Sequence, residues 1–182
     1  LWRFPNTPFV HVPVGSDASG NTVVRKHGTP KEGLAEEYLA IAKKLDLIDV
    51  DRAGKVSGSR FGYIKRELAL LEFAIVQFAF ETAIKEGFIP VIPPVMLKPE
   101  MLKGMGKIKF IEDKDAFYLP EDDLYLAGSA EHTIGPMHAD EIFNEKDLPK
   151  RYVAFSTFFR RVAGSYGKDT KGILRFHQFD KV

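Results

Sequence analysis

The sequence predicts an α+β protein in which an antiparallel β-sheet is flanked by helices. Two stretches with helical periodicity occupy the first half of the chain, at 34–47 and 64–85, and short apolar segments bounded by turn-forming residues fill most of the second half. With 182 residues, 45% of them hydrophobic, the chain is long enough to bury one core. We therefore expect one domain whose sheet is built mainly from the second half.

The first 33 residues are rich in residues that break regular structure. Four prolines and four glycines lie in this stretch, which suits an extended segment with turns. Its one strand candidate is Thr-Val-Val at 22–24. A helix is expected from 34 to 47, because apolar residues at 34, 38, 41 and 45 fall on one helical face.

A longer helix is expected at 64–85, after a loop at 49–60 that contains Gly and Ser. Its apolar positions recur at helical spacing, and Gly87 is well placed to end it, because glycine adopts left-handed backbone angles at little cost. The segment 88–92 has the pattern of a short strand. Pro90 confines it to a sheet edge or a strand end, because proline donates no backbone hydrogen bond.

The second half alternates short strands with turns. Two apolar runs, 116–119 and 124–127, flank a Pro-Glu-Asp-Asp turn and predict an antiparallel hairpin. Ser129 is expected to cap a helix that runs to about 141. Strands are expected at 152–159 and 173–179, joined by a loop rich in Gly, Lys and Arg.

Composition excludes several classes of function. The chain holds 26 Lys and Arg against 25 Asp and Glu, a net charge of +1, so no overall field attracts nucleic acid or an anionic membrane. It has no cysteine, which excludes disulfides, thiolate metal sites and a cysteine nucleophile. No apolar run approaches the ~20 residues of a membrane helix. We expect a cytoplasmic protein with no membrane partner.

Charge is distributed unevenly along the last part of the chain. The stretch 100–144 carries ten acidic and four basic residues, a net charge of −6, whereas 145–182 carries four acidic and nine basic residues, a net charge of +5. The basic excess favours a site for phosphate or carboxylate near the last two strands, although a solvated basic loop would have the same composition.

Common catalytic and metal-binding patterns are missing from the sequence. The stretch 164–170 superficially resembles a phosphate-binding loop, but Val162 and Asp169 stand where that pattern requires glycine and Ser or Thr. The five histidines lack the spacing of zinc ligands, and 104–106 lacks the third glycine of a dinucleotide fingerprint. These residues predict no metal site.

The strand–loop–strand unit that ends the chain carries its most specific pattern. It has F-R-R-V-A-G-S at 159–165 and R-F-H-Q-F-D-K-V at 175–182, and it resembles motif 2 of the class II aminoacyl-tRNA synthetases in their seryl-tRNA synthetase form. Upstream, 87–94 resembles motif 1, and G-S-A-E at 128–131 resembles the serine-binding element of that family. The segment 5–15 resembles the stretch that follows the family's N-terminal coiled coil.

This resemblance covers essentially the whole chain and implies an incomplete class II synthetase catalytic fold. Residues 1–182 would form its N-terminal part, with an extended segment at 1–33, the motif 1 region at 64–94 and motif 2 at 151–182. We expect motif 3 and the rest of the catalytic domain to lie beyond Val182, so that the fragment alone is inactive.

The resemblance also implies an activity and a set of partners. A seryl-tRNA ligase activates L-serine with ATP and Mg²⁺ to form seryl-adenylate, and then transfers serine to tRNA(Ser). A homodimer through the motif 1 region is implied as well. Two alternatives stay open: a catalytically inactive paralogue that serves as a binding or dimerisation module, and an adenylating enzyme whose acceptor is a carrier protein.

Roles for individual residues follow from the resemblance. Arg160 is implied as the catalytic residue that holds the α-phosphate and the serine carboxylate, a task that suits the planar donor fork of arginine. The serine-binding residues implied are Arg160, Ser129, Ala130 and Glu131. The ATP-binding residues implied are Arg160, Arg161, Val162, Arg175, Phe176 and Phe179.

From the residues alone, other interpretations of these positions remain. Ser129 and Glu131 would equally satisfy a helix N-cap with an acidic first turn, and Phe179 would equally serve as a core aromatic. Val162 departs from the family pattern F-R-x-E-A-G, which has glutamate at this position. A valine can neither accept a hydrogen bond from an ammonium group nor help to hold the nucleotide.

Overall fold

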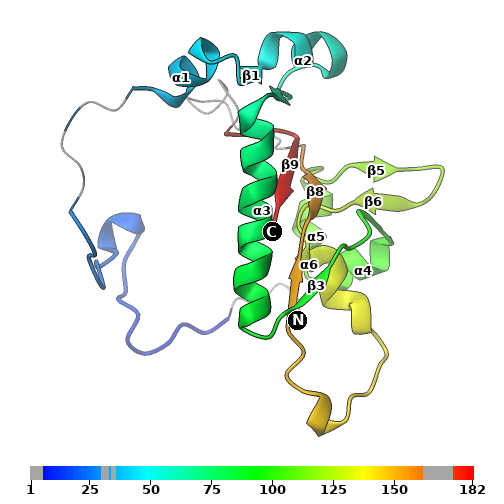
Figure 1. Ribbon diagram of the computed structural model, residues 1–182. Coiled ribbons are helices and arrows are strands. Elements are labelled where there is room, and N and C mark those ends of the chain that lie inside the picture. Colours follow the sequence, from blue (N-terminus) through cyan, green and yellow to red (C-terminus); the bar gives the residue numbers. More distant parts are fainter. Residues whose placement is uncertain (1–5, 30–32, 34–35, 162–173) are drawn as a thin grey trace. The chain divides into compact units, whose positions relative to one another are not determined.

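The computed structural model describes residues 6–29, 33, 36–161 and 174–182 (Figure 1). The chain divides into two compact units, 1–36 and 37–182. In the first unit a 3-10 turn, η1 (Ala18–Gly20), follows Asp17, whose side chain accepts a hydrogen bond from the Ser19 N–H. The strand expected at 22–24 does not form, because none of the described segments pairs with these residues, and Val23 and Val24 are exposed.

The second unit begins with two short helices, α1 (Tyr38–Lys44) and α2 (Val50–Ser57), and two two-residue strands, β1 (Ile48–Asp49) and β2 (Tyr63–Ile64), which pair antiparallel. The predicted loop at 49–60 is therefore wrong over most of its length. Asp49 caps α2, since its side chain accepts a hydrogen bond of 2.9 Å from the Arg52 N–H. The N-cap at Asp49 favours the helix more strongly than the Gly and Ser residues of the segment disfavour it.

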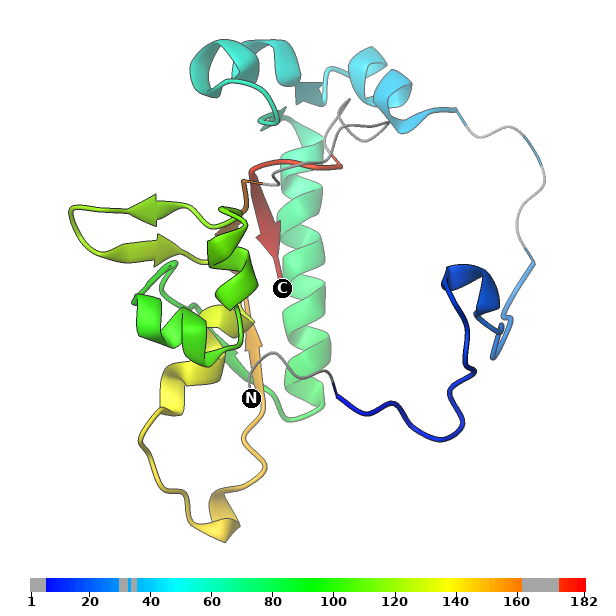
Figure 2. The same cartoon turned by 180° about the vertical axis from the view of Figure 1, so that it is seen from behind.

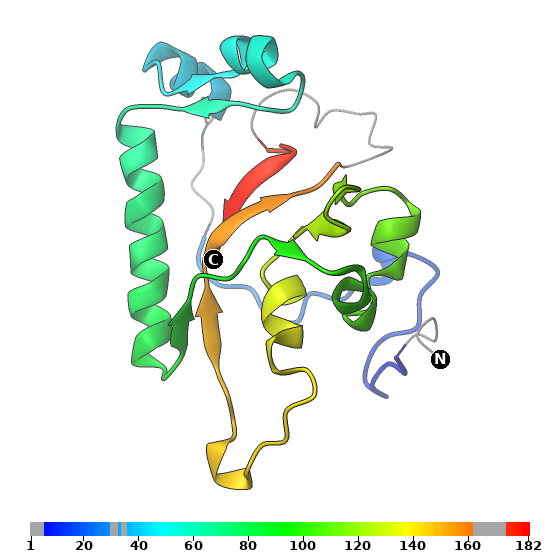
Figure 3. The same ribbon diagram turned by 90° about the vertical axis from the view of Figure 1, so that its right-hand side faces the viewer.

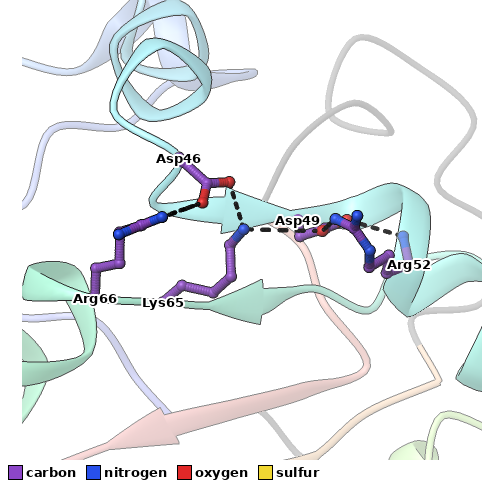
Figure 4. A network of polar contacts seen from close by, with 5 residues as sticks. All are labelled: Asp46, Asp49, Arg52, Lys65 and Arg66. Carbon is purple, nitrogen blue, oxygen red and sulfur yellow. Dashed lines mark hydrogen bonds and ion pairs between the residues drawn. The ribbon is translucent and has the colours of Figure 1, made fainter.

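Ion pairs connect β1 and β2 and the residues that flank them (Figure 4). Lys65 Nζ lies 2.5 Å from Asp46 Oδ1, Arg66 Nη2 lies 3.0 Å from Asp46 Oδ2, and Arg52 pairs with Asp49. The hydrogen bonds from Lys65 and Arg66 hold the pKa of Asp46 below its ordinary value. Because the network lies at the surface, it orders this strand pair locally and adds little to overall stability.

The long helix predicted from periodicity is confirmed as α3 (Glu67–Lys85). Gly87 follows it with a φ of +82°, which confirms the predicted helix end. The helix is apolar on all sides, yet none of its 19 residues, all of them described, is buried. It lies beside β9 (Gln178–Lys181), whose Asp180 and Lys181 line one cavity with residues of the helix (Figures 1 and 3).

Short strands form the sheet region of the second unit. β3 (Ile89–Val91) pairs with β7 (Tyr152–Ala154), and β8 (Ser156–Phe159) pairs with β9 (Gln178–Lys181). β4 (Met96–Leu97), β6 (Leu124–Leu126) and β5 (Tyr118–Leu119) form a three-stranded sheet in that order. The view from behind shows the β5–β6 hairpin projecting on the side away from α3 (Figure 2). The predicted hairpin and the α+β fold class are confirmed.

One strand pair departs from the predicted antiparallel arrangement, because β3 and β7 are parallel. About sixty residues separate them, enough for the long crossover that a parallel pair requires. The predicted strand at 152–159 is divided at Phe155, whose N–H donates 3.3 Å to the Val91 carbonyl. Before this residue the chain pairs with β3, and after it with β9.

The remaining helices are short: α4 (Pro99–Gly104), α5 (Ile108–Glu112), α6 (Glu131–Ile134), and the 3-10 turns η2 (Gly135–His138) and η3 (Glu145–Asp147). The helix predicted to reach 141 stops early as an α-helix, because Gly135-Pro136 removes a backbone donor and favours the tighter turn. A core of Leu97, Leu102, Ala127 and Phe158 lies between these elements. None of the helices in the described ranges is long and apolar enough to cross a membrane.

Candidate active site

The end of β8 brings Arg160 to a segment about thirty residues upstream. The Phe159 N–H donates 2.9 Å to the Ala127 carbonyl, which places Gly128 beside Arg160. Arg160 Nε then donates 2.8 Å to the Gly128 carbonyl. Arg160 is also fixed from its other side, because its N–H donates 2.9 Å to the His177 carbonyl. Its guanidinium therefore starts from an anchored backbone and keeps further donors for a ligand.

Ser129 and Glu131, which the sequence pairs, are joined in the structure. The Ser129 side chain is fully buried, and its Oγ donates a hydrogen bond to Glu131 Oε2. The prediction that Ser129 caps a helix is wrong: α6 begins after Ala130, whose side chain makes no cap. The hydroxyl bonds to Glu131 and Lys181 and makes no hydrogen bond to the start of the helix.

Lys181 completes this cluster and was not singled out from the sequence. Its Nζ donates 2.7 Å to Ser129 Oγ and lies 3.8 Å from Glu131 Oε2. Burial raises the pKa of Glu131, but the hydrogen bond from Ser129 and the charge of Lys181 outweigh it, so the pKa lies below its ordinary value. A signal was available: Lys181 follows Phe179 by two residues on a strand, which places both on one face.

A cavity of about 260 Å³ opens beside Arg160. It is lined by Lys107, Phe110, Asp115, His132, Arg160 and Arg175. Three cationic side chains against one carboxylate make this cavity suited to an anion. The two arginines that the sequence placed at opposite ends of motif 2, Arg160 and Arg175, thus share one cavity.

The other predicted ATP-binding residues lie elsewhere. The Arg161 guanidinium is 4.4 Å from the Phe117 ring centre, and the backbone N–H of Arg161 donates 2.8 Å to the Asp115 carbonyl. Phe176 and Phe179 line a separate cavity of about 470 Å³. Phe179 also packs on the core, 5.5 Å from the Arg160 guanidinium. Val162 lies outside the described residues.

His132 lines the 260 Å³ cavity and is otherwise buried, with 3% of its surface exposed. Its Nδ1 accepts a 3.2 Å hydrogen bond from the Gly128 N–H, and its ring packs against Phe110. Burial lowers its pKa from 6.5 to about 4; Glu131 opposes this shift, while Lys107, Arg160 and Lys181 add to it. The imidazole is therefore neutral at physiological pH.

This burial predicts a pH-dependent stability. The unfolded chain takes up the proton near pH 6.5 and the folded chain only near pH 4, so stability is complete above 6.5 and falls as the pH drops between these values. From pH 7 to pH 5 we expect His132 to account for a loss of about 2 kcal/mol in the free energy of unfolding. Urea titrations of the wild type and His132→Asn at both values test this; equal losses in the two proteins would contradict it.

The resemblance implies Mg²⁺, so the described residues were searched for a group of side chains that could hold a metal ion. Among residues 6–29, 33, 36–161 and 174–182, no group of three or more His, Cys, Asp or Glu side chains is arranged to hold a metal ion.

Comparisons with known proteins define the class. Residues 116–182 match the tRNA synthetase class II core domain (G, H, P, S and T). The fold is shared with a Giardia lamblia prolyl-tRNA synthetase in complex with prolyl-adenylate, at a TM-score of 0.64 and 20% identity over 79% of this chain and 29% of that one. The chain thus carries a class II aminoacyl-tRNA synthetase core.

Curated relatives and solved structures narrow the assignment. A serine–tRNA ligase of Sulfurihydrogenibium sp. is 43% identical over 185 residues, covering 100% of this chain and 44% of its own, and one of Acidothermus cellulolyticus is 50% identical over 146 residues, covering 80% and 34%. Seryl-tRNA synthetase from Pyrococcus horikoshii complexed with ATP matches with a TM-score of 0.90 and 38% identity, covering 99% of this chain and 45% of that one. The chain belongs to the serine–tRNA ligase family. It spans less than half the length of these relatives.

Proposed function

We propose that the protein to which this chain belongs activates L-serine with ATP and transfers it to tRNA(Ser), and that this chain supplies the serine pocket and part of the ATP pocket. The observation that carries the proposal is the 2.8 Å hydrogen bond from Arg160 Nε to the Gly128 carbonyl. It joins the motif 2 arginine to the segment of Ser129 and Glu131, so one side chain can reach both substrates. The cysteine-free sequence favours the cytoplasm.

The activation step requires charge neutralisation. A serine carboxylate oxygen attacks the α-phosphorus of ATP, a new O–P bond forms, and the bond to the departing pyrophosphate breaks. The attacking carboxylate and the triphosphate are both anionic, so these groups repel each other until cations lie between them. Arg160 can hold oxygens of both with its fork of donors. Arg175 and Lys107, on the same cavity, would meet the other phosphates.

Serine recognition is assigned to the cluster of Ser129, Glu131 and Lys181. The lowered pKa of Glu131 keeps its carboxylate ionised, and an ionised carboxylate binds the α-ammonium group of an amino acid. A buried polar pocket also disfavours alanine, which would leave its hydrogen-bonding groups unpaired. Phe179, exposed to the 470 Å³ cavity, is assigned to stacking on adenine. Phe176, which lines the same cavity as Phe179, and Arg161, which packs against Phe117, would then help to shape the ATP pocket.

Replacing Glu131 by glutamine tests the serine pocket. The change removes the negative charge and keeps the shape, so we expect the KM for serine to rise about 10- to 100-fold, the value of one hydrogen bond to a charged group. The KM for ATP should change little. The measurement is serine-dependent exchange of pyrophosphate into ATP by the full-length protein, with the exposed Glu121→Gln as control.

The same assay distinguishes the alternatives. No exchange by the full-length wild type would contradict the ligase and favour the inactive binding module, for which Val162 is the specific observation. Exchange without charging of tRNA(Ser) would favour a carrier protein as acceptor.

We also propose that the motif 1 region forms a homodimer. Leu70 and Phe73 of α3 are 70% and 67% exposed, and Phe73 lies on the helix face opposite Leu71 and Ile75. A helix that is apolar on all sides is normally covered on all sides. Sedimentation of the full-length protein should therefore show a dimer, and Phe73→Lys should shift it toward monomer. A wild-type monomer at micromolar concentration would contradict this proposal.

A further inference from the structure

We propose that His132 is a positioning residue, which fixes Arg160 for catalysis through the backbone of Gly128. The inference rests on the proposed function, because it assigns His132 a purpose in the reaction that Arg160 would promote. No substrate atom needs to touch the imidazole for this role.

The backbone of Gly128 contacts both His132 and Arg160. Its N–H donates 3.2 Å to His132 Nδ1, and its carbonyl accepts 2.8 Å from Arg160 Nε. The N–H and the carbonyl flank a single Cα, so any rotation of the Gly128 backbone moves the acceptor that holds the guanidinium. With the N–H tethered to a buried ring, that carbonyl has one defined direction.

The space around Gly128 makes the tether rigid. A Cβ at this position would lie 2.8 Å from Phe110 Cζ and 3.3 Å from His132 Cε1, so the backbone is pressed against both rings. The residues on each side, Ala127 and Ser129, are fully buried. Because close-packed interiors do not yield gradually, the segment has little freedom except through a change at one of the rings.

The chemistry of His132 suits an acceptor and excludes a donor. To accept from Gly128, Nδ1 must be unprotonated, and the proton of the neutral ring then sits on Nε2. The ring is buried and faces the charges of Lys107, Arg160 and Lys181, with only Glu131 opposing them. A second proton would put an N–H against the Gly128 N–H and break the tether.

Alignment of Arg160 matters most in the transition state. A misplacement of about 1 Å at a reacting group can cost about 100-fold in rate. Losing the tether should therefore lower kcat far more than it raises the KM for serine, because Arg160 is only one of the serine contacts, and Ser129 and Glu131 bond to each other and to Lys181 without His132.

The test compares two substitutions in the full-length protein. Asparagine can place its side-chain oxygen near the position of Nδ1, whereas leucine fills the volume with no acceptor. We expect His132→Leu to lower the kcat of pyrophosphate exchange by about 10- to 100-fold with the KM for serine within about threefold. His132→Asn should retain most of the rate. Thr133→Val, which loses a bond to the Ala130 carbonyl in the same helix, is the control and should keep wild-type kcat.

A second readout is independent of activity. Hydrogen–deuterium exchange of the peptide that spans Gly128 should be faster in His132→Leu and unchanged in His132→Asn. If His132→Leu does not fold, His132→Gln, whose oxygen lies one bond too far along, replaces it. Unchanged kcat and exchange in the leucine or glutamine variant would overturn the proposal, as would equal losses in His132→Asn. If the wild type shows no pyrophosphate exchange, the proposed function fails, while the hydrogen-exchange comparison still decides whether His132 tethers Gly128.

Discussion

Replacing Arg160 by lysine is expected to lower serine-dependent pyrophosphate exchange by about 100- to 1000-fold, the loss typical when one preorganised donor to a developing charge is removed. The substitution keeps the positive charge, so a loss of activity would come from the changed arrangement of hydrogen-bond donors. Arg160 uses Nε for the Gly128 carbonyl, and the other N–H groups of its guanidinium are the donors proposed to bind the ligands. A lysine has a single ammonium at the end of a flexible stem and cannot serve the carbonyl and a bidentate substrate together.

Arg52→Lys is the matched control. Arg52 is exposed and pairs with Asp49 at the start of α2, and it lines neither cavity described above. The Arg52→Lys variant should show the same rate of serine-dependent pyrophosphate exchange as the wild type. If Arg160→Lys kept more than a tenth of the wild-type rate, bidentate contact by Arg160 would be disproved, and charge alone would account for its role.

Local patterns made part of the fold predictable. α3 and the β5–β6 hairpin follow from spacing and turn residues within short windows, so the sequence of each stretch determines it. α2 was missed because a capping residue, Asp49, decided between helix and loop. The parallel pairing of β3 with β7 depends on how distant segments meet, which no local pattern encodes.

The candidate site shows the same division. Arg160, Ser129 and Glu131 were indicated by a family motif, and the structure brings them together. Lys181 reaches Ser129 only because β8 and β9 pair in the register that sets Phe158 opposite Phe179. The sequence showed His132 only as one of five histidines without the spacing of zinc ligands, because its contact with Gly128 arises from the turn between β6 and α6. A sequence shows which residues have suitable chemistry, whereas the contacts between their side chains depend on how strands pair and where turns form.

Phe158→Ala should be the most destabilising single substitution in the core. Phe158 is fully buried and contacts the cluster of Leu97, Leu102 and Ala127. Removing a buried phenylalanine side chain leaves a cavity and costs about 3–5 kcal/mol of unfolding free energy. Urea unfolding of the chain measures it. Val56→Ala, at a position 71% exposed on α2, is the control and should change stability by less than about 0.5 kcal/mol.

The position of Phe158 links this loss to the site. It lies on β8, two residues before Arg160, which follows the end of the strand, and its ring faces Phe179 at 6.4 Å between ring centres. The cavity left beneath β8 should destabilise this strand more than it destabilises the helices. Backbone hydrogen exchange in β8 and β9 should therefore become faster at denaturant concentrations at which α3 is still protected. A loss below 1 kcal/mol, or equal exchange in α3 and β8, would show that the site is held by contacts other than this core.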